Sequence, residues 1–167
     1  WGLNTHFSPG PLKSNVRVVI PSGIGLSQIS KILTQRGVLN QPFAFKLAAK
    51  LLGESKSLRA GEYFFEAQSS PNAVLEKLSS GNIILRQITI PEGLTSLEVI
   101  KKLDQTEGLI GQVSVKVPEG TLLPETYNYK FGDTRNSILL RMQKEMVIFV
   151  EKELERRRIN LPLKSKE

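Results

Sequence analysis

Hydrophobic and polar positions repeat with two different periods along this chain, and the changes of period predict short strands alternating with helices. Alternating β-branched residues at 16–20 and 83–90 are typical of pleated strands. Between them, apolar residues recur every three or four positions, as on one face of a helix. The expected elements of this half are helices at about 26–36, 42–52 and 71–80 and an aromatic strand ending at Phe65. The pattern therefore predicts a βααβ unit followed by a third helix.

Two helical stripes are expected to form the core of this first unit. Each consists of apolar residues at helical spacing: Leu26, Ile29 and Leu33 in the first helix, and Phe43, Leu47 and Leu51 in the second. Such a stripe is the side that a surface helix buries. Because β-branched strands bracket both helices, we expect both stripes to pack on a small sheet.

A short strand that runs into Pro-x-Gly occurs three times, with turns at 21–23, 91–93 and 118–120. Proline cannot continue the ladder of a strand, and glycine permits the positive φ of a turn. The first two copies lead into helices, and a capping box of Thr95 and Glu98 opens the helix expected at 96–104. The third copy, with an expected strand at 113–117, leads instead into a polar, aromatic loop before a long helix to about residue 158. This difference makes the third copy the candidate functional segment.

Composition and charge narrow the class of protein. The expected fold class is α+β, and 167 residues suffice for one sizeable domain or two small ones. The net charge of +7 is uneven, because residues 1–88 hold 10 basic and 4 acidic side chains. A basic front half suggests nucleic acid, anionic lipid or an acidic wall polymer as partner, and an ordinary solvated basic surface is the alternative.

Composition alone excludes two kinds of chemistry and argues against several others. The chain has no cysteine, which excludes thiol nucleophiles and disulfides, and its single histidine, His6, has no partner for a triad or a metal site. We therefore expect neither a metal nor a cofactor. No apolar run reaches the roughly 20 residues of a membrane span. The basic run 156–158 complements the end of the long helix, so nucleic acid is not an expected partner.

Five short blocks occur in a characteristic order: Ile20–Gly23, Arg59–Tyr63, Ser79–Gly81, Ile90–Gly93 and Pro118–Tyr127. Together they resemble the YceG-like family of endolytic murein transglycosylases. The Glu-Gly-x-Leu-x-Pro-x-Thr-Tyr phrase within the last block is the most specific. The resemblance extends from about residue 16 to the end of the chain.

The resemblance implies a single-pass protein of the bacterial inner membrane whose domain faces the periplasm or extracytoplasmic side. Residues 1–15 would then be a linker after a missing membrane anchor, 16–88 a LysM-like module, and 89–167 the first part of the catalytic domain. Such an enzyme cleaves the β-1,4 bond between N-acetylmuramic acid and N-acetylglucosamine within a glycan strand and leaves a 1,6-anhydro end. One carboxylic acid suffices, because the muramyl 6-hydroxyl is the attacking group.

This chain lacks the segment that carries the family's catalytic glutamate, Ala-Ser followed by two aliphatic residues and Glu-Lys-Glu. Glu151-Lys152-Glu153 shares the last three letters but follows Ile148-Phe149-Val150 within the expected long helix. No catalytic residue is therefore assigned, the acid is expected beyond Glu167, and these 167 residues alone are expected to be inactive.

The third Pro-x-Gly segment supplies the expected substrate-binding residues: Glu119, Glu125, Thr126 and Tyr127. The carboxylates would bond sugar hydroxyls and the tyrosine would stack on a pyranose ring. In the alternative, Glu119 and Thr126 cap turns and Tyr127 packs in the core. The expected partners are peptidoglycan glycan strands, cell-wall synthases and the inner membrane. The rival function is a non-catalytic peptidoglycan-binding or scaffold module.

Overall fold

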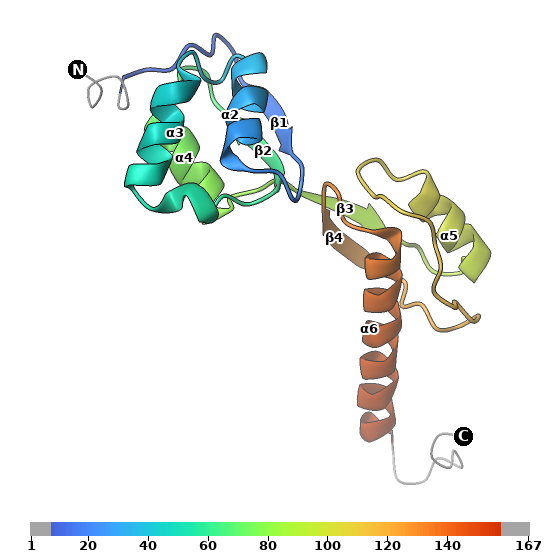
Figure 1. Ribbon diagram of the computed structural model, residues 1–167. Helices are drawn as coiled ribbons and strands as arrows, with labels where there is room; N and C mark the ends of the chain where they lie inside the picture. The colour runs from blue at the N-terminus through green and yellow to red at the C-terminus, as the bar shows by residue number, and fades with distance from the viewer. Residues whose placement is uncertain (1–7, 158–167) are drawn as a thin grey trace. The chain divides into compact units, whose positions relative to one another are not determined.

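The computed structural model describes residues 8–157, which form two compact units (Figure 1). Among the described residues, unit 1 comprises 8–86 and 128–132, and unit 2 comprises 87–127 and 133–157. The α+β fold class is confirmed. His6, the first residues of the expected linker and Arg158 lie outside the described residues. Between residues 8 and 157, we find no helix with the length and apolar character needed to cross a membrane.

The sheet of unit 1 is an antiparallel pair of short strands, β1 (Val16–Ile20) and β2 (Gly61–Phe65). Val16 lies opposite Phe65, and Ile20 lies opposite Gly61. Gly61 has a φ of 146°, and a Cβ there would lie 2.6 Å from Cγ2 of Ile83. Only glycine therefore allows β2 to start this close to the Ile83 side chain.

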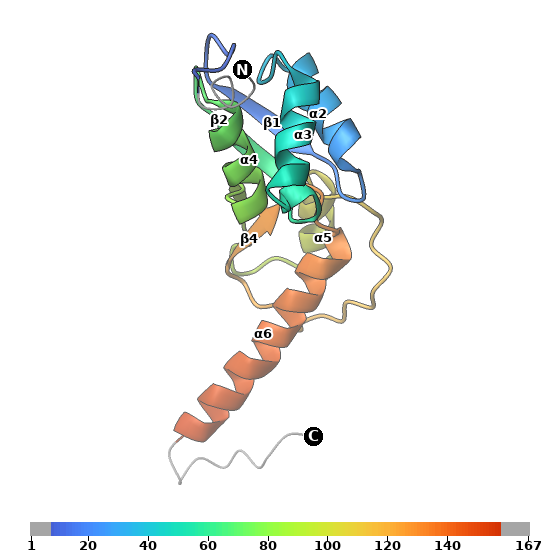
Figure 2. The same cartoon turned by 60° about the vertical axis from the view of Figure 1, so that its left-hand side comes forward.

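Three helices of unit 1 share one core with this sheet: α2 (Leu26–Gln35), α3 (Pro42–Leu51) and α4 (Pro71–Ser80). A short 3-10 turn, η1 (Glu54–Lys56), follows α3. Both ribbon views show the helices packed together beside β1 and β2 (Figures 1 and 2). The core includes Val18, Ile20, Ile29, Leu33, Phe45, Ala49, Tyr63, Phe65, Val74, Leu75 and Leu78. The first predicted stripe thus contributes Ile29 and Leu33, as expected.

The prediction for the second stripe is wrong. Phe43, Leu47 and Leu51 on α3 are 74%, 48% and 78% exposed, whereas Phe45 and Ala49 are buried. Residues 42–52 are apolar on nearly every side, so helical spacing alone offers more than one candidate face. The packed face is the one on which the small Ala49 lets neighbouring helices approach and Phe45 fills the remaining space.

Unit 2 is built on α5 (Ser96–Asp104) and the first half of α6 (Arg135–Arg156). Its core includes Ile88, Ile90, Val99, Leu103, Leu109, Leu122, Tyr127, Ile138, Leu139 and Met142. Arg135 joins the two helices, because its guanidinium donates to the carbonyls of Leu103 and Asp104 at the end of α5 and lies 3.0 Å from Oδ1 of Asp104. Cations at this position also complement the negative end of the α5 dipole.

Two predictions about strands are wrong, one for residues 126–130 and one for residues 113–117. β3 (Leu85–Thr89) pairs with β4 (Thr126–Lys130), a segment expected to be a loop. The strand expected at 113–117 is irregular instead, with the Ser114 amide donating to Oδ1 of Asn136 and the Gln143 amide donating to the carbonyl of Lys116. Side chains of α6 thus replace a strand ladder for 113–117.

Candidate functional site

The third Pro-x-Gly turn is attached to the start of α5 through Glu119. Both carboxylate oxygens of Glu119 accept from the backbone N–H of Ser96, at 2.9 and 3.1 Å. The Ser96 hydroxyl donates in return to the carbonyl of Pro118, at 3.1 Å. The first N–H groups of a helix have no partner within the helix, and negative charge there is favourable. Glu119 therefore acts as a helix cap supplied by a distant segment.

A second carboxylate, Glu98, serves the same helix start from within α5. The backbone N–H and hydroxyl of Thr95 donate to Oε2 of Glu98, at 2.8 and 2.7 Å, and the Glu98 N–H donates to the Thr95 hydroxyl. These bonds hold the pKa of Glu98 below its usual value. The predicted capping box is confirmed, and Glu98 is committed to it.

Tyr127 lies inside unit 2, with 3% of its surface exposed. Its hydroxyl donates to the carbonyl of Leu123, at 2.8 Å. Burial raises the pKa of Tyr127, and the carboxylates of Glu145 and Glu125 raise it further. The ring therefore presents no open face for a sugar in this structure, which favours the alternative in which Tyr127 packs in the core.

Glu125 and Thr126, like Glu119, are exposed members of the predicted set. Oε1 of Glu125 accepts from the Thr126 N–H at 3.1 Å, and the Thr126 hydroxyl lies 2.9 Å from the Thr89 hydroxyl on the neighbouring strand. Both side chains remain accessible to a ligand. Substrate binding by Glu119, Glu125, Thr126 and Tyr127 stays a prediction, and the described contacts of Glu119 are those of a helix cap.

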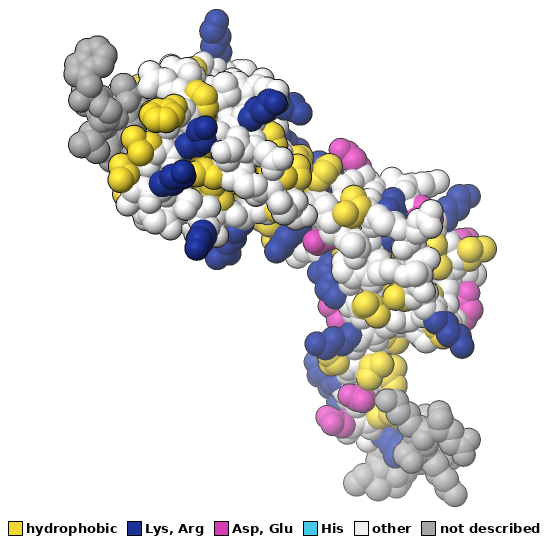
Figure 3. All heavy atoms as spheres, in the orientation of Figure 1, with side chains coloured by type: hydrophobic (Ala, Val, Ile, Leu, Met, Phe, Trp, Pro, Cys, Tyr) yellow, Lys and Arg dark blue, Asp and Glu magenta, His cyan; other side chains and the backbone are white. Residues whose placement is uncertain are grey.

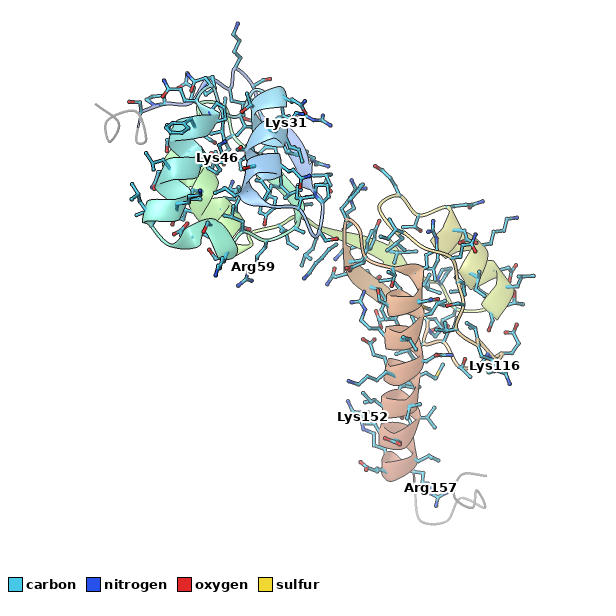
Figure 4. All side chains as sticks on the ribbon, viewed as in Figure 1. Lys31, Lys46, Arg59, Lys116, Lys152 and Arg157 are labelled. Carbon is cyan, nitrogen blue, oxygen red and sulfur yellow. The ribbon has the colours of Figure 1, made fainter. Side chains whose placement is uncertain are left out.

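A groove of about 440 Å³ lies between the 116–121 segment and α6. Its lining residues are Lys116, Pro118, Gly120, Thr121, Gln143, Met146, Val147 and Val150. Lys116 is labelled on the segment beside α6 in Figure 4. No carboxylate is among these lining residues, so the groove suits apolar contact and offers no carboxylic acid for proton transfer. Within residues 8–157, no cluster of three side chains suited to holding a metal ion occurs.

Unit 1 contains an ion pair between Glu62 and Arg86 that the sequence does not predict. Nε of Arg86 lies 2.8 Å from Oε2 of Glu62, and a second nitrogen lies 3.2 Å from Oε1. The Arg86 guanidinium also lies 5.2 Å from the centre of the Phe131 ring. The hydrogen bond from Arg86 lowers the pKa of Glu62, although burial opposes it. No local pattern marks this pair, because the partners lie far apart in the chain.

Replacing Glu119 with alanine should lower the free energy of unfolding by about 1 kcal/mol, the usual cost of losing a helix cap. The reason is the loss of both bonds to the Ser96 amide. The matched control is Glu125→Ala in the same exposed loop, which should change stability by less than about 0.5 kcal/mol. Urea unfolding followed by circular dichroism would measure both, and equal effects would contradict the capping role.

Comparisons with known proteins agree on one family. The sequence profile of the YceG-like family matches residues 18–167. The chain is 31% identical over 172 residues to an endolytic murein transglycosylase of Bacillus subtilis, covering 83% of this chain and 47% of that protein. It is 25% identical over 184 residues to an endolytic murein transglycosylase of Streptococcus pneumoniae, covering 85% of this chain and 32% of that protein. The chain thus spans half or less of the length of these relatives.

Among solved structures, a yceG-like protein of Listeria monocytogenes aligns with a TM-score of 0.47 and 24% sequence identity. The alignment covers 86% of this chain and 57% of that chain.

Proposed function

Because this chain belongs to the YceG-like family, we propose that it is part of a peptidoglycan lytic transglycosylase that cuts glycan strands internally. The observation that carries the proposal is the family match over residues 18–167, nearly the whole chain. The two relatives bearing that activity in their names support it. The substrate of the whole protein would then be the glycan strands of peptidoglycan.

The proposed reaction needs one proton donor and no added water. A carboxylic acid protonates the oxygen that links N-acetylmuramic acid to N-acetylglucosamine, and that bond breaks. The 6-hydroxyl of the same muramyl residue attacks the anomeric carbon, gives its proton to the carboxylate formed in the first step, and closes a 1,6-anhydro ring. In this chain, the exposed side chains of Glu125 and Thr126 would bond sugar hydroxyls of the glycan strand.

We also propose that these 167 residues do not cleave glycan by themselves. The Ala-Ser-led Glu-Lys-Glu segment does not occur among them. Glu98 and Glu119 are bound to the start of α5, and Glu153 is paired with Arg156 at 3.2 Å on α6. The acid of the whole protein would come from a segment outside this sequence.

Residues 16–88 would form a LysM-like module that binds peptidoglycan beside the catalytic domain. The antiparallel pairing of β1 and β2 around α2 and α3 supports a βααβ arrangement. We further propose, on the family resemblance alone, a single-pass anchor in the inner membrane with these domains on the outer side. Cell-wall synthases would be its protein partners there.

Digestion of purified sacculi tests the proposal. We expect the whole parent protein to release muropeptides with 1,6-anhydro ends, detected by mass spectrometry, and the 167-residue chain to release none above a buffer control. Absence of product with the whole protein would contradict the transglycosylase proposal and favour the non-catalytic scaffold. Product with the 167-residue chain would mean that it contains the acid, and Glu125→Gln and Glu153→Gln would then locate it.

A further inference from the structure

The outward side of α3 carries an apolar row that no other described residue of unit 1 covers. Phe43, Leu47 and Leu51 are 74%, 48% and 78% exposed and follow one another at a spacing of four residues. Lys46 and Lys50 form the adjacent row, because positions three and four apart are neighbours on a helix. We call these five residues the α3 outer face. The helix buries Phe45 and Ala49 on its other side, so this face has no role in the core.

The α3 outer face borders a groove at the start of α2. This groove has a volume of about 390 Å³, and Leu26, Gln28, Phe43, Lys46, Leu47 and Lys50 are among its lining residues. Figure 3 shows apolar side chains over α3 with lysine or arginine side chains beside them. The surface thus combines apolar contact area with two ammonium groups at its edge.

The charged side chains of the sequence around α3, residues 1–53, are all basic. Residues 1–53 contain no aspartate or glutamate, and their basic residues are Lys13, Arg17, Lys31, Arg36, Lys46 and Lys50. Figure 4 labels Lys31 on α2 and Lys46 on α3. The first carboxylate, Glu54, begins η1 after α3 has ended. Nothing on β1, α2 or α3 therefore repels an anionic partner, and electrostatic attraction would act over the whole region.

An anionic lipid bilayer is the partner that matches both properties. Exposed Phe and Leu side chains on a helix enter the boundary between headgroups and acyl chains, while flanking lysines extend to the phosphates. A glycan strand is a poorer match, because the apolar row offers no hydrogen-bonding group to sugar hydroxyls. We propose that the α3 outer face docks unit 1 on the surface of a bilayer containing anionic lipids. This goes beyond the transglycosylase proposal and does not depend on it.

Vesicle co-sedimentation of the 167-residue chain tests the docking. The chain should bind vesicles of phosphatidylglycerol and phosphatidylcholine at low salt, bind pure phosphatidylcholine much more weakly, and lose affinity as salt is raised. Lys46→Gln with Lys50→Gln should weaken binding about 30-fold, the factor for two lysines at an anionic surface. Phe43→Ser with Leu47→Ser should weaken it at least about 10-fold through lost apolar burial.

Matched controls lie on α5. Leu97→Ser removes an apolar side chain that is 74% exposed, and Lys101→Gln with Lys102→Gln removes two exposed lysines. These variants should bind vesicles like the unaltered chain, and all variants should keep its circular dichroism spectrum. Failure to bind anionic vesicles, unchanged binding by the α3 variants, or equal losses in the α5 controls would overturn the proposal. Loss of binding to purified sacculi with unchanged binding to vesicles would assign the face to glycan instead.

Discussion

Replacing Phe45 with alanine is expected to lower the free energy of unfolding of unit 1 by about 3–5 kcal/mol, the usual cost of removing a buried phenylalanine. Phe43→Ala, two positions earlier on α3, should change it by less than about 0.5 kcal/mol. The reason is burial, because Phe45 is 1% exposed and Phe43 is 74% exposed. The two variants remove the same atoms from the same helix, so the difference in helix propensity cancels between them.

Urea unfolding monitored by circular dichroism would measure the difference as a shift of the transition midpoint. The comparison decides which side of α3 faces the core, since Phe43 begins the row that spacing favoured and Phe45 lies on the row that the structure buries. Equal losses for the two variants, or a larger loss for Phe43→Ala, would contradict the burial of α3 described above.

Replacing Arg86 with methionine is expected to cost about 3 kcal/mol at pH 7, near the lower end for breaking a buried ion pair. The Glu62 side chain is 5% exposed and would keep its charge without the guanidinium that now contacts both its oxygens. We expect a cost at the lower end of that range because the Arg86 side chain is 22% exposed, and the pair is therefore only partly buried. The double variant Glu62→Gln with Arg86→Met should recover part of the loss, because it removes the buried charge as well.

The effect of Arg86→Met should depend on pH in a defined direction. In the unaltered protein the pKa of Glu62 is lowered by Arg86, so the pair stabilises the fold above the usual glutamate pKa and loses this contribution as pH falls. Without Arg86, burial favours the protonated form of Glu62, and the charge of Arg17 still opposes it. The deficit of the variant should therefore shrink between pH 7 and about pH 4. A deficit of the same size at both pH values would rule out the loss of the ion pair as its cause.

The segment 118–127 shows how far a motif predicts a site. Its position in the chain and its turn were predictable, because Pro-x-Gly specifies local geometry and Gly120 has the positive φ of 73° that such a turn uses. The contacts of its side chains were not predictable from the sequence. Glu119 reaches Ser96, 23 residues earlier, and Tyr127 points into a core that includes α6 residues, and neither partner is marked by local spacing.

Local residue patterns are sufficient to predict the elements whose ends depend on neighbouring residues. The capping box of Thr95 and Glu98 places the start of α5, and Ser70 with the left-handed Gly81 brackets α4, because all of these bonds close within a few residues. Long-range packing determines which side of α3 is buried, which strand pairs with β3 and which cation contacts Glu62. Each of these features depends on a partner that is distant in sequence. A residue pattern indicates that a surface is apolar or that a backbone is extended, but it does not specify which residues cover the surface or which strand pairs with the backbone.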